Sequence, residues 1–480
     1  MPRPIRLNAF DMNCVAHQSP GLWRHPDDRA ADYRKLSYWT DLAQLLERGR
    51  FDGLFIADVL GIYDVYGGSR DATVRHATQV PVNDPAMLIS AMAAVTEGLG
   101  FGLTASISFE HPYPFARRMS TLDHLTDGRV GWNVVTSYLD SGARNLGEAA
   151  QLTHDNRYDV ADEYLEVCYK LWEGSWEDDA VVRDRAAGIF TDPAKVHGIE
   201  HEGEYFKVPG IHLCEPSPQR SPVIYQAGAS ARGRQFAAEH AEAIFTAAPT
   251  KEILKETVGD IRRRMREAGR DPYDARIYNL LTAITDETKA KAWAKHDDLE
   301  RYGDDEAALT LFSGWMGVDL AEYDLDDPIG EVESNAIHSA VAAFQQADPE
   351  GGEWTVRDIA RWGVIGGLGP RVVGSPAEVA DHMQEWIDYS DVDGFNLAYA
   401  ITPGTFVDAV EHLIPELQRR GVAPTEYAPG TLREKLFAAG PRLPESHPGA
   451  AYRDLGPGAP AERGAFLSHS ERKAPQGVAA

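Results

Sequence analysis

The sequence predicts an α/β protein folded as a (β/α)8 TIM barrel with insertions, and three observations support this. Eight short apolar segments alternate with amphipathic stretches along most of the 480 residues. The chain is 43% hydrophobic, which is enough for a large core. Polar residues recur near the ends of the apolar segments, where barrel enzymes carry their active sites. A doubly wound open sheet would show the same alternation, so the strand pattern alone leaves both folds open.

The eight predicted strands are apolar runs bounded by turn residues. They cover residues 6–10, 51–58, 101–107, 130–137, 222–228, 241–248, 276–284 and 393–400. Amphipathic stretches between them, such as YWTDLAQLLERG and KEILKETVGDIRRRMREAG, predict the surrounding helices. Ser375, Pro376 and Glu378 form an N-cap, a first-turn proline and a capping-box partner, which predicts a helix start at that point.

Two long stretches interrupt this rhythm, residues 174–217 and roughly 300–362, and both are polar and rich in Gly, Pro and Asp. Stretches of that length inside a compact fold are usually functional, so we expect insertions that cover a site. Residues 1–440 are therefore predicted to form one barrel domain. Residues 441–480 are rich in Pro, Gly, Ala and Ser, which predicts a C-terminal arm or a disordered tail.

Charge and composition exclude several classes of partner. The formal charge of −27 argues against binding to nucleic acid or to an anionic membrane. No apolar run approaches the ~20 residues that span a bilayer, and the start, MPRPIRLNAFDMN, lacks an apolar signal core. These features predict a cytoplasmic protein. The three cysteines are too few and too scattered for a disulfide framework or a cysteine-based metal site, and no metal site is expected.

The segment PVIYQAGASARGRQFAAEHAEAIF, residues 222–245, predicts an anion site. An apolar strand ends in the small residues 227–230, including Gly228 and Ser230, and a helical stretch follows at once. Small residues expose backbone N–H groups, and a helix N-terminus favours negative charge. A second helix start carries His154, Arg157 and Tyr158 in its first turn, although these residues alone would also suit a solvated charged turn. Together the two helix starts predict a phosphate site.

The chemistry itself points to a bound cofactor. No nucleophile–base set, GxSxG motif, Walker loop or GxGxxG fingerprint is present. A cofactor with one phosphate, an apolar ring and its own redox chemistry fits best, which indicates flavin mononucleotide (FMN). Further polar groups at predicted strand ends are candidates to face it or its substrate, namely Cys14, His17, Asp58, Thr104, Asn133 and Tyr138.

Long strings of the sequence resemble one enzyme family. They are NAFDMNCVAHQSPGLWRHP, FIADVLGIYDVYGG, VPVNDP, ARRMSTLDHLTDGRVGWNVVTSY, HDNRYDVADEYLEVCYKLWEGSWEDD, CEPSPQRSPVIYQAGAS and DGFNLAYAITPGTF. The chain is similar over about residues 5–455 to the bacterial-luciferase-like flavin monooxygenases. Within them it resembles the nitrilotriacetate, dibenzothiophene-sulfone and dimethyl-sulfide monooxygenase group.

This resemblance implies a luciferase-like barrel that binds reduced FMN, made from NADH by a separate flavin reductase, and uses O₂. The family's flavin-contact positions fall on Asp58, Thr104, Asn133, His154, Tyr158 and Ser230, with Arg157 and Gly228 beside them. The implied mechanism passes through a flavin C4a-(hydro)peroxide. A homo-oligomer, either a dimer or a tetramer, is also expected.

The resemblance places Cys14, His17, Tyr63, Gln79 and Tyr138 on the substrate side as catalytic candidates. Alkane-oxidising relatives share the first four but carry histidine in place of Tyr138, which favours a small organic sulfide here. Oxidation of dimethyl sulfide would yield methanethiol and formaldehyde. Long-chain alkanes and other organosulfur or xenobiotic substrates remain alternatives, as does a dehydrogenase that uses F420 or flavin on the same barrel. Tyr138 is expected to narrow the pocket and to donate one hydrogen bond.

Overall fold

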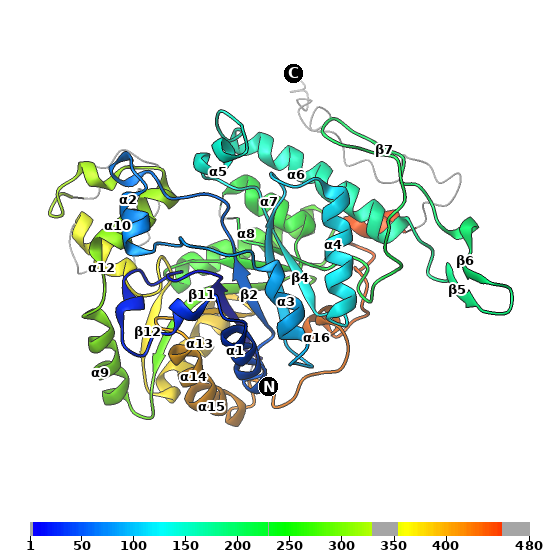
Figure 1. Cartoon of the computed structure of the whole chain (residues 1–480). Helices are drawn as coiled ribbons and strands as arrows, with labels where there is room; N and C mark the ends of the chain where they lie inside the picture. Colours follow the sequence, from blue (N-terminus) through cyan, green and yellow to red (C-terminus); the bar gives the residue numbers. More distant parts are fainter. Residues whose placement is uncertain (1–2, 229, 329–353, 454–480) are drawn as a thin grey trace, which may run out of the picture.

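The computed structural model describes residues 3–228, 230–328 and 354–453. Its centre is a closed barrel of eight parallel strands ringed by helices (Figure 1). The strands are β1 (Arg6–Met12), β2 (Gly53–Ala57), β3 (Gly100–Ser106), β4 (Val130–Val135), β9 (Val223–Gln226), β10 (Ala243–Thr246), β11 (Arg276–Thr285) and β13 (Gly394–Ala398). β10 pairs with β11 and closes the ring, which an open doubly wound sheet would not do. The predicted barrel and its eight strands are confirmed.

Helices surround this barrel, and further helices lie in the insertions and at the barrel ends. They are α1 (Leu36–Arg48), α2 (Asp71–His76), α3 (Ala86–Ala93), α4 (Pro112–Leu125), α5 (Asp140–Asn145), α6 (His154–Tyr169), α7 (Ala231–His240), α8 (Lys251–Glu267), α9 (Lys289–Glu300), α10 (Asp305–Met316), α12 (Val356–Gly363), α13 (Pro376–Ser390), α14 (Gly404–Asp408), α15 (Ile414–Arg419) and α16 (Leu432–Phe437). In α8 the buried Leu254, Val258, Ile261 and Met265 follow the helical repeat of an amphipathic face.

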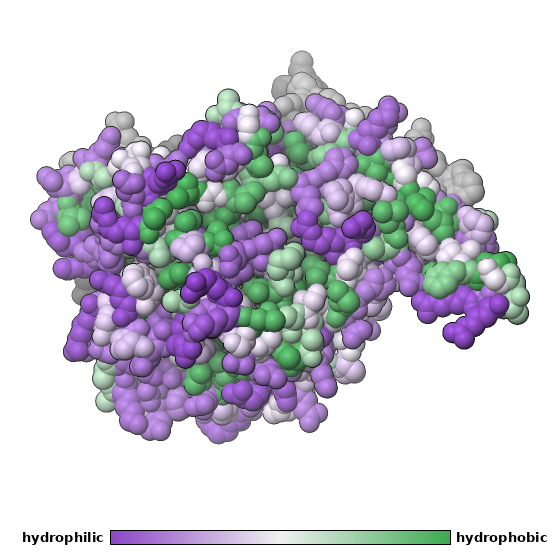
Figure 2. All heavy atoms as spheres, viewed as in Figure 1, coloured by the Kyte–Doolittle hydropathy of each residue, from purple (hydrophilic) through white to green (hydrophobic). Residues whose placement is uncertain are grey.

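Local signals set several of these helix starts. Ser375 and Glu378 form the predicted capping box of α13, with Pro376 at its first position. Thr250 caps α8 by accepting a hydrogen bond from the Ile253 N–H. No helix in the described ranges is both long and apolar enough to cross a membrane. Hydrophilic residues cover much of the face seen in Figure 2, with apolar residues scattered among them.

The two insertions differ in form and in place. Residues 174–217 carry two small hairpins, β5 (Val181–Asp184) with β6 (Ile189–Thr191), and β7 (His201–Glu202) with β8 (Lys207–Val208). The described part of 300–362 carries α10 and α12 on the opposite edge of the view in Figure 1. The short strand β12 (Arg371–Gly374) pairs with the end of β11.

The first part of the predicted C-terminal arm lies against the barrel. Leu443 and Tyr452 are 2% and 3% exposed. Arg442 and Arg453 both donate to Oε2 of the buried Glu173, at 2.7 and 3.1 Å. Residues 441–453 are therefore held by apolar contacts and by two ion pairs. The remainder of the predicted tail, 454–480, lies outside the described residues.

Candidate active site

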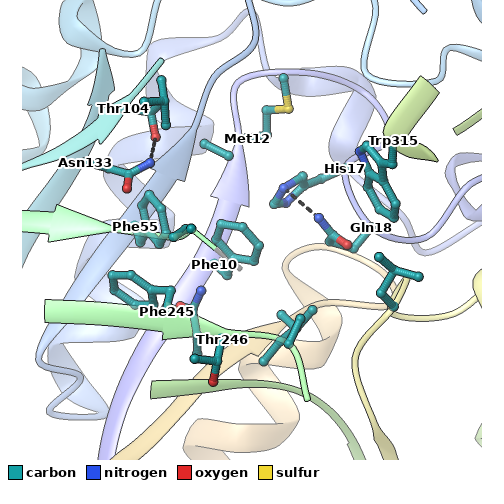
Figure 3. A pocket seen from close by; sticks show the side chains of 18 of the residues that line it. Phe10, Met12, His17, Gln18, Phe55, Thr104, Asn133, Phe245, Thr246 and Trp315 are labelled. Carbon is teal, nitrogen blue, oxygen red and sulfur yellow. Dashed lines mark hydrogen bonds between the residues drawn. The ribbon is translucent and has the colours of Figure 1, made fainter. Parts of the chain in front are cut away.

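A cavity of about 670 Å³, here called the barrel cavity, opens at the carboxyl ends of the strands (Figure 3). Aromatic rings line one side of it. The Phe55 ring centroid lies 4.9 Å from that of Phe10 and 4.5 Å from that of Phe245. These rings come from β2, β1 and β10, so barrel closure brings them together. The arrangement provides an apolar surface suited to a flat ring or a small apolar molecule.

A pair of polar side chains faces this aromatic side (Figure 3). Thr104 and Asn133 are register partners on β3 and β4, and Asn133 Nδ2 donates to Thr104 Oγ1 at 3.0 Å. Asn133 Oδ1 is buried and has no hydrogen-bond partner among the residues that the structure describes. A buried carbonyl oxygen without a donor is costly, so this atom is a ready acceptor for an N–H or O–H group of a bound molecule.

A second cavity of about 900 Å³, here called the polar cavity, joins the first. Eight residues line both cavities: Asp58, Val59, Thr104, Val135, Tyr138, Ala227, Gly228 and Trp315. His154, Arg157, Tyr158 and Ser230 line the polar cavity alone. Every predicted cofactor residue therefore lies at one or both cavities, which together can accommodate a molecule with an apolar end and an anionic end.

The turn after β9 is shaped for close approach. Ser230 Oγ caps α7 by accepting from the Gly233 N–H at 3.0 Å, and it contacts His154 Nε2 at 3.1 Å. A Cβ on Gly228 would lie 2.3 Å from Gln226 Nε2 and 2.9 Å from the Cα of Gly233, so only glycine fits this position. The α6 and α7 N-termini meet here, and their dipoles favour an anion between them.

Arg157 and Tyr158 complete this side of the polar cavity. Arg157 Nη1 donates to the Ser137 carbonyl, while Arg157 Nε is buried without a partner. Burial lowers the Arg157 pKa, yet the group stays cationic near neutrality because its ordinary value is so high. The Tyr158 ring lies 5.2 Å from that of His154. The guanidinium is therefore available to a phosphate oxygen.

Asp58 stands at the junction of the two cavities. Burial raises its pKa to about 7, and the charge of Asp84 adds to the shift. Near neutrality this carboxyl group is a mixture of protonated and ionised forms. It can therefore either donate or accept a hydrogen bond at the point where both cavities meet.

The predicted substrate-side residues separate into two groups. His17, Gln79 and Tyr138 line the barrel cavity, whereas Cys14 and Tyr63 are 2% and 1% exposed and line neither cavity. Burial raises the pKa of Cys14 well above its ordinary value, so its thiol stays neutral and unreactive. Tyr63 reaches the site through hydrogen bonds to its neighbours rather than by direct exposure.

His17 is a neutral group in this setting. Burial lowers its pKa to about 3, and its ring packs edge-on against Phe10 with centroids 4.4 Å apart. Its Nε2 lies 3.2 Å from Gln18 Nε2, which is a donor, so the ring proton resides on Nδ1 (Figure 3). A neutral imidazole can polarise a neighbour but does not supply an imidazolium at neutral pH.

Sequence reasoning missed Trp315, which lines both cavities. It belongs to α10, inside the second predicted insertion. The only local signal is the preceding Gly314, where a Cβ would lie 1.9 Å from the Tyr63 ring. That glycine lets α10 press against Tyr63 and brings the Trp315 indole over the strand ends. Residues 174–217 line neither cavity, so the cover expected there is not found, and Trp315 supplies part of the cover instead.

Two carboxylate–histidine groups in the described residues have potential metal-ligand atoms within 4.8 Å of one another, Asp162–Glu239–His240 and His296–Asp297–Glu300. Neither group lines the barrel cavity or the polar cavity. Asp162 already pairs with Arg232 at 2.6 Å. His197 and His201 are spaced four apart, but they contact different carboxylates, Glu177 and Glu163. These groups are accounted for as ion pairs.

Comparison with known proteins identifies the family. The model of the luciferase-like monooxygenases matches residues 11–391. The chain belongs to the luciferase-like monooxygenase family. This luciferase-like monooxygenase is 54% identical over 455 residues to the dimethyl-sulfide monooxygenase of Hyphomicrobium sulfonivorans, covering 95% of each chain. It is 51% identical over 456 residues to the long-chain alkane monooxygenase of Geobacillus thermodenitrificans, covering 95% of this chain and 99% of that one.

The fold of this luciferase-like monooxygenase agrees with those relationships. It superposes on the crystal structure of DmoA from Hyphomicrobium sulfonivorans with a TM-score of 0.90 at 54% identity, over 94% of this chain and 96% of that one. The predicted family and the predicted enzyme class are both confirmed.

Proposed function

We propose that the protein is the oxygenase component of a two-component flavin monooxygenase and that it oxidises dimethyl sulfide. The observation that carries this proposal is the junction of a polar cavity suited to an anion with an apolar, aromatic-lined one, and Tyr138 and Trp315 line both. The 54% identity to a dimethyl-sulfide monooxygenase supports the choice of substrate. The reductase would be a separate protein, because no dinucleotide fingerprint is present in the sequence.

The residues present fit FMN. The phosphate would lie between the α6 and α7 N-termini, against Ser230, His154 and the free Nε of Arg157. The ring would lie toward the barrel cavity, where Asn133 Oδ1 can accept a hydrogen bond from it. When bound in its reduced form, FMN supplies two electrons and activates O₂.

The overall reaction balances as dimethyl sulfide plus O₂ plus FMNH₂ giving methanethiol, formaldehyde, water and FMN. The barrel cavity suits a small apolar substrate because its aromatic side offers no charge and His17 is neutral. Asp58 can hold a proton near pH 7 at the point where the cavities meet. Tyr138 and Trp315, which line both cavities, limit the access of water to them, and this protects an oxidising site from side reactions.

The test is a product assay with full-length protein. NADH absorbance should stay constant with FMN and dimethyl sulfide until a flavin reductase is added. Methanethiol and formaldehyde should then appear in equal amounts. Rapid NADH oxidation by this chain alone would refute the two-component assignment, and reduced FMN consumed without organic product would refute the substrate.

A long-chain alkane is the second candidate, and the 51% identity to an alkane monooxygenase supports it. A panel of sulfides and alkanes of increasing length separates the two. We expect turnover to fall with chain length in the wild type and to extend to longer substrates in Tyr138→Ala, with more hydrogen peroxide released per FMNH₂. Efficient turnover of long alkanes by the wild type would favour the second candidate.

A further inference from the structure

Four side chains from separate segments form a hydrogen-bonded cluster beside the barrel cavity. At the centre, Tyr63 OH lies 2.8 Å from Gln79 Oε1, 2.6 Å from Tyr138 OH and 3.2 Å from Trp315 Nε1. Tyr63 is 1% exposed, so water does not compete for these bonds. Each bond has one donor, and the available protons can be assigned one by one.

The donors and acceptors of the cluster can be assigned starting from Gln79. Its Nε2 donates to the backbone carbonyl of His17 at 2.8 Å. A flipped amide would set two acceptor oxygens against each other at that distance, so the orientation is determined. Gln79 Oε1 therefore faces Tyr63 as an acceptor, and the Tyr63 hydroxyl proton must go to it.

The remaining bonds of Tyr63 follow from this. The Trp315 indole N–H is a donor only, so it donates to the Tyr63 oxygen. The one lone pair still available on that oxygen faces Tyr138. Tyr138 must therefore give its only hydroxyl proton to Tyr63. Gln79 and Tyr63 act as positioning residues that set the hydrogen-bond polarity of Tyr138.

Tyr138 links this hydrogen-bonded cluster to the two cavities. It lines both cavities and is 45% exposed. Desolvation by the surrounding protein raises its pKa to about 12, so the phenol is neutral. Its oxygen can offer lone pairs to a bound molecule but no proton. By this assignment, the one hydrogen bond that Tyr138 is expected to donate goes to Tyr63 and not to a bound molecule.

We propose that Tyr138 is a specificity-determining residue that meets organosulfur molecules only as a hydrogen-bond acceptor, so that the part of the cavity beside Tyr138 favours thioethers over sulfoxides and sulfones. The S=O oxygen is itself an acceptor without a proton. When the S=O oxygen faces the Tyr138 oxygen, it loses its hydration and gains no hydrogen bond. A thioether instead presents C–H groups and a weakly polar sulfur. This inference deepens the proposed function and rests on its assignment of a sulfide substrate.

The test reverses the polarity without removing the hydroxyl group. In Gln79→Met the acceptor for Tyr63 is lost, so Tyr63 can donate to Tyr138, and the Tyr138 proton becomes free to turn toward the cavity. Dimethyl sulfoxide and dimethyl sulfone are the probes. Their binding to full-length, FMN-saturated protein is measured by ligand-observed NMR. We expect Gln79→Met to bind both probes up to about tenfold more tightly than the wild type, the size of one net hydrogen bond.

Two further variants isolate the cause. Gln79→Met/Tyr138→Phe should lose the gain, because the phenol that donates is gone. Trp315→Phe retains Gln79 as the acceptor and should show no gain, although it also perturbs the cluster. A gain that persists in the double variant, or an equal gain in Trp315→Phe, would overturn the proposal. So would wild-type protein that binds dimethyl sulfoxide as tightly as dimethyl sulfide.

Folding is checked by circular dichroism and thermal unfolding of each variant. If Gln79→Met fails to fold, Gln79→Leu provides the same comparison, since its side chain also removes the acceptor for the Tyr63 hydroxyl proton. The binding assay uses no turnover. Absence of dimethyl-sulfide oxidation would therefore refute the proposed function alone. Probe affinities that do not follow the expected order among the variants would refute this inference alone.

Discussion

The two ends of the barrel treat buried polar groups in opposite ways. At the amino ends of the strands, Arg433 and Glu242 are each 1% exposed and form a bidentate pair, with Nε–Oε1 at 2.6 Å and Nη2–Oε2 at 2.8 Å. The same guanidinium donates to the carbonyl groups of Pro441 and Ser221. Glu242 also accepts from the Ile224 N–H. The Arg433–Glu242 pair at this end is therefore fully hydrogen-bonded.

The carboxyl ends are different. Within the described part of the chain, Asn133 Oδ1, Arg157 Nε and His17 Nδ1 are buried without partners. Burial raises the pKa of the Asp58 carboxyl group to about 7. Each of these groups costs stability in the ligand-free chain and gains it when a ligand supplies the missing partner. The difference teaches that one fold uses buried polarity for stability at one end and for binding at the other.

The largest expected effect comes from breaking the Arg433–Glu242 ion pair. Arg433→Met leaves Glu242 buried without its cation, which should lower the free energy of unfolding by about 3–5 kcal/mol. Urea unfolding followed by circular dichroism measures the loss. The double variant Arg433→Met/Glu242→Met is the matched control and should recover most of it. A single variant as stable as the wild type would show that the pair is not needed for stability.

The next effect concerns the binding end. Arg157→Ala removes the free Nε beside the anion site and should weaken FMN binding by about 1.5–3 kcal/mol, or tenfold and more. Unfolding stability without FMN should change little. Riboflavin lacks the phosphate, so its affinity should be the same in the wild type and the variant. Equal losses for FMN and riboflavin would show that Arg157 does not serve the phosphate.

A smaller effect follows from Asp58. Its folded pKa of about 7 lies above the ordinary value of 3.8, so the folded state holds the proton more tightly than the unfolded state. Below about pH 4 both states are protonated and Asp58 costs nothing, and the cost grows until about pH 7. Asp58→Asn should therefore raise the free energy of unfolding at pH 8 and raise it progressively less toward pH 5. A gain independent of pH would contradict this assignment.

The smallest effect lies on the surface and serves as the reference for the comparison. Lys291 and Glu287 form an i,i+4 pair at 2.5 Å in which both side chains are more than half exposed. Water and salt screen such pairs. Lys291→Ala should leave the melting temperature unchanged within error. A clear loss would mean that paired charge stabilises this protein wherever it occurs, and the contrast between the two ends would lose its meaning.

Much of the site could be predicted from the chain because its residues follow strands. Asp58, Thr104 and Asn133 are placed by the carboxyl ends of β2, β3 and β4, and Ser230 by the cap that starts α7. Trp315 could not be predicted in this way. It is 252 positions from Tyr63, and its contact depends on how α10 folds back over the barrel. Cys14 follows the same strand rule as His17, yet its side chain turns into the interior and lines neither cavity.

The sequence by itself determined the order and positions of the eight strands and the helix cap at Ser375. The reason is that hydrophobic periodicity and capping act over a few residues. Only the tertiary structure decided which polar groups found partners. Arg433 meets Glu242 across 191 positions, while Asn133 Oδ1 and Arg157 Nε meet none. Barrel closure brings such groups within hydrogen-bond distance or leaves them apart, and no local pattern records which.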